Sequence, residues 1–179
     1  MDEYKYTSAA IESGADGAAV VNVRDILFKR EFRAACERNS CGKYGKCWMC
    51  PPDVGEIDEM INRARGYRHA LVVQSIGRLE DSFDIEGMEY AAKRHNSIIQ
   101  TLAAELDSMP GDSLKLGAGA CRVCERCARA DEESCRNPDK AIASLEAYGI
   151  AVSELSKTSG MNYVNGPNTV TFFGVFLFK

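Results

Sequence analysis

The spacing of the cysteines constrains this chain more than any other feature of its sequence. All eight cysteines among the 179 residues fall into two groups, and none is left over. The first group reads C-x4-C-x5-C-x2-C and consists of Cys36, Cys41, Cys47 and Cys50. The second reads C-x2-C-x2-C-x7-C and consists of Cys121, Cys124, Cys127 and Cys135. Structural zinc and cubane iron–sulfur clusters both take four thiolates per site, so two metal sites are predicted.

The competing uses of cysteine are disulfides and ordinary core packing. The N-terminus carries Asp2 and Glu3 without an apolar signal region, and the longest apolar run, residues 172–178, is far short of the roughly 20 residues of a membrane span. We therefore expect a cytoplasmic protein without a membrane span, where disulfides are rare. Core cysteines follow the hydrophobic period, whereas these lie in polar, charged segments.

The second group favours iron over zinc. Structural zinc usually takes two C-x2-C pairs, but three cysteines at successive x2 spacings are typical of a bacterial ferredoxin around a [4Fe–4S] cube. The x7 interval before Cys135 departs from the ferredoxin pattern. The prediction is two [4Fe–4S] clusters, with one cluster or zinc as the alternatives. Because two-cluster ferredoxins exchange their fourth ligands, an exchange of Cys50 and Cys135 stays open.

Charge is distributed unevenly along the chain. The net charge of −4 gives no reason to expect nucleic-acid binding. Residues 29–50 nevertheless carry six cations and two anions, a local charge of +4, whereas residues 121–140 carry five of each. The basic segment is either a solvated surface or a docking site for an acidic redox partner protein.

Hydrophobic periodicity predicts a single α/β domain over residues 1–179, with a mixed sheet of four to five strands flanked by helices and two cysteine-rich metal-binding loops. Residues 1–17 are expected to be a loosely packed lead-in. Strands are predicted at 18–23, 70–76, 114–118 and 170–178, the last forming a hairpin with 162–164, and helices at 25–36, 53–65, 86–107 and 137–149, with a further helical turn at 150–156. Pro110 and Gly111 are expected to end the third helix.

Two predicted helices start just after a cysteine group. Asp53, with Glu56 three residues on, and Asn137, followed by Pro138, are good N-terminal caps. Both clusters would then lie near helix N-termini, where partial positive charge favours anions.

Other residues suggest less specific roles. Gly117 and Gly119 would let backbone N–H groups approach sulfur, and Trp48 with Tyr44 would either shield a cluster or simply pack the loop. His95 lies on the apolar stripe of a long helix, which favours a hydrogen-bonded core histidine over a ligand. No catalytic triad, phosphate loop or dinucleotide fingerprint is present, so catalytic residues stay unassigned.

Several motifs together resemble one known family. They are Cys41-Gly-Lys-Tyr-Gly-Lys-Cys47-Trp-Met-Cys50-Pro-Pro, Ala118-Gly-Ala-Cys121-Arg-Val-Cys124-Glu-Arg-Cys127, Cys135-Arg-Asn-Pro138, Leu145-Glu-Ala-Tyr-Gly-Ile150 and Thr169-Val-Thr-Phe-Phe-Gly174. In this order they are similar to the prokaryotic predicted metal-binding proteins called domain of unknown function 2284. The resemblance covers the chain from about Asp25 on and implies metal binding of iron–sulfur type. It implies no reaction.

Three functions follow from these expectations. The favoured one is single-electron transfer to or from a partner enzyme through two [4Fe–4S] clusters. The second is an enzyme with one catalytic cluster, in which Cys36 is not a permanent ligand and leaves an iron open to substrate. The third is a zinc-stabilised interaction module. A homodimer is expected only if the apolar last strand lies at a sheet edge.

Overall fold

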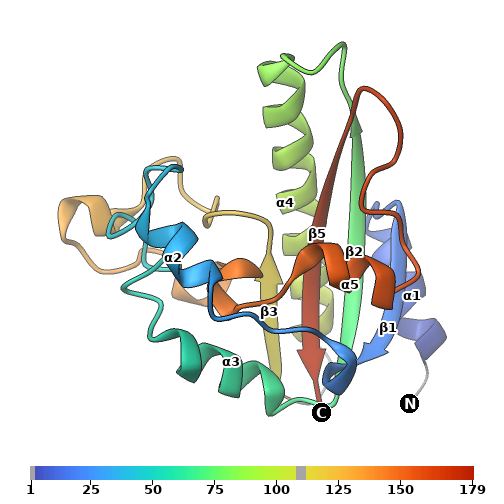
Figure 1. The fold of residues 1–179 in the computed structure, drawn as a ribbon, viewed down its shortest axis with the longest axis horizontal. Coiled ribbons are helices and arrows are strands. Elements are labelled where there is room, and N and C mark those ends of the chain that lie inside the picture. Colours follow the sequence, from blue (N-terminus) through green and yellow to red (C-terminus); the bar gives the residue numbers. More distant parts are fainter. Residues whose placement is uncertain (1–2, 108–111) are drawn as a thin grey trace.

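A computed structural model describes residues 3–107 and 112–179 as a five-stranded sheet with helices on both faces (Figure 1). The strands, in the spatial order β1-β2-β5-β3-β4, are β1 Gly17–Asn22, β2 His69–Arg78, β5 Thr169–Phe178, β3 Ser113–Gly117 and β4 Ala143–Ser144. The α-helices are α1 Glu3–Glu12, α2 Phe32–Glu37, α3 Ile57–Arg65, α4 Ile85–Asp107 and α5 Val152–Thr158. Because β3 pairs with β4 in parallel and the other pairs are antiparallel, the sheet is mixed, which confirms the predicted α/β class.

The central strand β5 divides the core into two layers. Phe176 belongs to the cluster under α1 and α4, and Phe173 and Val175 belong to the cluster on the opposite face. This alternation follows the two-residue period of a strand with both faces buried. β5 is hydrogen-bonded to β2 along its whole length and to β3 over Val175–Phe178, so it is an inner strand of the sheet rather than an edge strand.

Two predicted segments near the N-terminus differ in the structure. The loosely packed lead-in is wrong, because α1 buries Ala9 and Ala10 against the sheet. The helix predicted at 25–36 is mostly replaced by the 3-10 turn Val23–Asp25 and a bridge between Phe28 and Ile150, which leaves only α2. Hydrogen bonds to residues distant in the sequence therefore determine the structure of this segment, and its weak helical period does not.

The helix predicted at 137–149 is also wrong. The segment contains the 3-10 turns Pro138–Lys140 and Glu146–Tyr148, with β4 between them, and it ends at Gly149 with a φ of +73°. Pairing of Ala143 with Leu116 extends the sheet there instead of a helix. Residues 162–164 form no strand, so the expected hairpin is absent, and the predicted helix end at Pro110 and Gly111 lies outside the described residues.

Within the described residues, no helix combines the length and the apolar composition needed to cross a membrane.

Close packing of α4 on the sheet requires glycine at position 174. A Cβ there would collide with the Ile99 side chain and come within 3.2 Å of the Leu116 carbonyl oxygen. We predict that Gly174→Ala lowers the free energy of unfolding by about 1–3 kcal/mol through overpacking, as measured by urea denaturation followed by circular dichroism. Gly117→Ala is the control, because its Cβ would meet only Ile142 at an ordinary 3.5 Å. Equal stability of the two variants would contradict this packing.

Candidate metal centre

The two cysteine groups lie side by side beyond the end of β3 (Figure 1). The first lies in α2 and in the segment between α2 and α3, and the second follows β3 directly. A hydrogen bond joins them, because the Trp48 indole N–H donates to the Glu133 carbonyl oxygen over 2.9 Å. Segments 85 residues apart in the chain are therefore in direct contact.

An ion pair also clamps the two segments together. The Arg129 Nε atom lies 2.8 Å from Asp53 Oδ1, and the side chains are only 26% and 13% exposed. The same guanidinium stacks over the Trp48 ring at 5.2 Å from its centroid. Asp53 therefore does not cap a helix as predicted: α3 begins later, at Ile57, and Glu56 precedes it without a side-chain cap.

Five of the eight cysteines line one small cavity between the two segments. They are Cys47 from the first group and all four members of the second, Cys121, Cys124, Cys127 and Cys135. Trp48 and Met49 close the cavity on the side of the first group. The structure thus places Cys47 together with the second group, which the spacing of the sequence alone did not predict.

Cys47 is the most deeply buried cysteine, and the pKa of its thiol is lowered. A hydrogen bond from the Cys50 thiol lowers the pKa of Cys47 to about 6 against the opposing effect of burial, helped by the backbone N–H groups of Met49 and Cys121 and by the Cys127 thiol. This sulfur therefore contacts both groups and is the one most readily deprotonated for metal binding.

The other three cysteines of the first group lie on the outer side of Cys47. The pKa of Cys50 is raised mainly by its hydrogen bond to Cys47 and by burial, and the nearby sulfurs of Cys41 and Cys36 add to this effect. Burial also raises the pKa of the Cys36 thiol, while Arg33 opposes the shift. Cys41 is exposed. The sulfurs of the first group therefore lie near one another, and Cys47 belongs both to this group and to the lining of the cavity.

Hydrogen bonds to sulfur support the second group. The Asn137 amide donates to Cys124 Sγ over 3.2 Å, so this residue serves the sulfur rather than capping the predicted helix. Cys121 accepts backbone N–H bonds from Val123 and Ile142, rather than from Gly117 or Gly119 as expected. Such donors stabilise thiolate ligands and tune the metal that they hold.

In the part of the chain that the structure describes, no three His, Cys, Asp or Glu side chains converge on a position for one metal ion. The cavity lined by the five cysteines measures about 20 Å³.

The spacing of the sequence marks the eight cysteines but not the residues that bring the two groups together. Trp48 was singled out, whereas Arg129 and Glu133 carry no local pattern that marks them as partners of the first group. His95 is buried in the core and its Nδ1 lies 2.8 Å from Ser75 Oγ, as predicted for a hydrogen-bonded core histidine.

Breaking the clamp is expected to weaken the join between the two cysteine groups. Asp53→Asn removes the charge that faces Arg129, and we predict a loss of about 1–3 kcal/mol in unfolding free energy together with faster metal release to a chelator. Asp58→Asn is the matched control, because its ion pair with Arg30 is exposed and worth at most about 1 kcal/mol. Equal chelation rates in the two variants would contradict a clamping role.

Comparison with known proteins agrees with this centre. The family model of the predicted metal-binding proteins DUF2284 matches residues 19–178, which include both cysteine groups and all five strands except the first two residues of β1. Searches of curated proteins and of solved structures find no match. The chain therefore belongs to the DUF2284 family of predicted metal-binding proteins.

Proposed function

We propose that this protein holds two [4Fe–4S] clusters in a reducing, cytoplasmic environment and passes single electrons to or from a partner protein. The observation that carries the proposal is the position of Cys47, which hydrogen-bonds within its own group and also lines the cavity of the other. All eight cysteines are free thiols, as ligands of such clusters must be before the metal binds.

The ligand sets follow the two groups. Cys36, Cys41, Cys47 and Cys50 hold the first cluster, and Cys121, Cys124, Cys127 and Cys135 hold the second. Cys47 is then the ligand of the first cluster nearest to the second. The run of contacts from Cys50 through Cys47 to Cys127 supports close approach of the two clusters, which suits electron exchange between them.

The outer surface of the first group suits an acidic partner. Arg38, Lys43 and Lys46 are exposed, and none of them makes an ion pair within the described residues. By contrast, Arg30 pairs with Asp58, and Arg33 donates to the Gly55 carbonyl oxygen. Unpaired cations around the exposed Cys41 would steer a negatively charged redox partner toward the first cluster.

Metal analysis tests the proposal. Protein purified without oxygen from iron-replete cells is expected to be brown and to contain about eight irons and eight inorganic sulfides per chain, the content of two cubanes. Colourless protein with firmly bound zinc would overturn the proposal.

Paired serine variants test the ligand sets within the same measurement. Cys47→Ser is expected to lose the first cluster, about four irons, and to keep the second. Cys135→Ser is the matched variant and is expected to lose the second cluster and to keep the first. If Cys47→Ser kept the first cluster and lost the second, the ligand sets given above would be wrong.

A further inference from the structure

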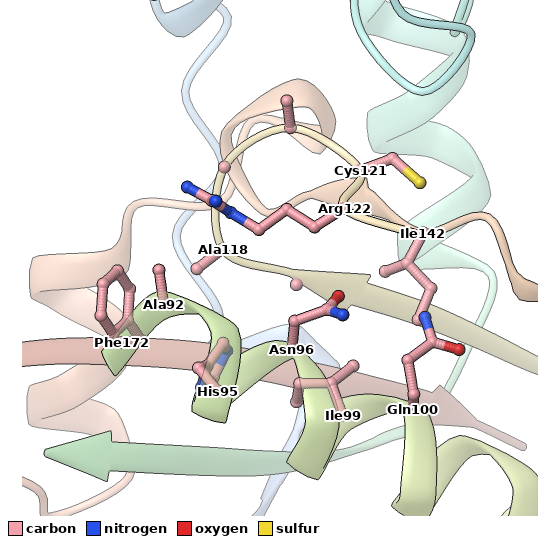
Figure 2. Close-up of a pocket in the computed structure, with 13 residues that line it drawn as sticks. Ala92, His95, Asn96, Ile99, Gln100, Ala118, Cys121, Arg122, Ile142 and Phe172 are labelled. Carbon is pink, nitrogen blue, oxygen red and sulfur yellow. The ribbon is translucent and has the colours of Figure 1, made fainter. Parts of the chain in front are cut away.

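A hollow lies beside the second cysteine group, between α4 and residues 117–122 (Figure 2). It measures about 110 Å³ and opens next to a wider depression of about 460 Å³. The two share Asn96, Ala120, Cys121 and Arg122 in their linings. Figure 2 shows the Cys121 sulfur pointing away from the hollow, so this space is separate from the cavity lined by the five cysteines.

The inner hollow is lined by positive charge only. Arg122 is the one charged side chain in its lining, all of which the structure describes, and its guanidinium extends across the hollow (Figure 2). Arg122 makes no hydrogen bond or ion pair with any described residue, unlike Arg126 in the same loop, which pairs with Asp131. Arg122 is exposed, and an unpaired guanidinium beside a hollow can bind a carboxylate through two parallel N–H bonds.

Two more polar groups in the lining lack partners. Asn96 projects from α4 toward the loop and forms no side-chain hydrogen bond within the described chain (Figure 2). His95, at the base of the hollow, is 3% exposed, and its Nε2 atom is buried without a hydrogen-bond partner. A buried polar group without a partner is unfavourable, which makes it a site for a ligand or an ordered water.

The environment of His95 keeps its imidazole ring uncharged. Burial lowers the pKa of His95 to about 4, although the Phe173 backbone partly opposes the shift, so the ring is uncharged at neutral pH. When the Ser75 hydroxyl donates to Nδ1, 2.8 Å away, the proton of the ring resides on Nε2. The imidazole then presents an N–H group at the base of the hollow.

The remaining walls are apolar and limit the size of a ligand. Ile99, Ile142 and Phe172 face the polar groups (Figure 2). A cavity of about 150 Å³ accommodates the six carbons of benzene, so this hollow has room for a molecule of about four to six non-hydrogen atoms.

We infer that this hollow binds a small carboxylate, with its anionic end on Arg122 and Asn96 and its short tail against Phe172 and Ile99. This goes beyond electron transfer, since it gives the protein a small-molecule ligand next to the backbone of Cys121. An anion bound there would make the reduction potential of the second cluster more negative, because reduction adds a further negative charge nearby.

Propionate, with five non-hydrogen atoms, is the probe, and its neutral isostere propionamide is the matched control. Saturation-transfer NMR on the metal-loaded protein is expected to show that propionate binds at least about tenfold more tightly than propionamide, since charge-assisted bonds to arginine are worth about 1.5–3 kcal/mol. Arg122→Gln should weaken propionate binding by about 10- to 100-fold.

Arg24→Gln is the control variant, because it removes the same charge from an exposed residue of the turn after β1, outside the lining of the hollow. It is expected to bind propionate like the parent protein. Equal affinity for propionate and propionamide, or unchanged affinity in Arg122→Gln, would overturn the inference and would mean that only water fills the hollow. Either result leaves the iron count unaffected, so a failure here is distinct from a failure of the two-cluster proposal.

Discussion

The contact between the two cysteine groups depends on Arg129. Its guanidinium pairs with Asp53 and stacks over Trp48, which in turn donates to the Glu133 carbonyl oxygen. One cation thus holds residues that precede α3 against residues that follow β3. Because the pair is largely shielded from water, its attraction is screened less than that of the exposed pairs elsewhere on the surface. This contact adds to the hydrogen bonds that Cys47 accepts from the Cys121 N–H group and the Cys127 thiol.

The sheet makes that contact possible. β5 lies between β2 and β3, and both of its faces are buried, so the end of β3 has a fixed position. The second group starts four residues beyond Gly117 and therefore begins from a rigid support. The same loop forms one wall of the hollow against α4, so the cysteines and the ligand site that we infer share the segment from Ala118 to Arg122.

Local signals in the sequence were sufficient for β1, β2, β3 and β5 and for α4, and they mark the eight cysteines. A strand with both faces apolar, such as β5, and a long amphipathic helix carry their own period, and the cysteines are marked by their spacing. The helix expected at 137–149 failed because Ala143 pairs with β3, an interaction between residues 27 apart in the chain. Asp53 and Asn137 were expected as caps for their residue type. Both instead bond to partners from the second cysteine group, which no local pattern indicates.

The two-cluster proposal requires the sulfurs of the two groups to lie close enough for two clusters to exchange electrons. Electron paramagnetic resonance of the fully reduced, metal-loaded protein tests this requirement. Two clusters this close are expected to give a spectrum broadened or split by magnetic coupling, and the coupling is lost when Cys135→Ser removes one of them. A spectrum equal to the sum of two isolated clusters, unchanged in shape when one is removed, would contradict it.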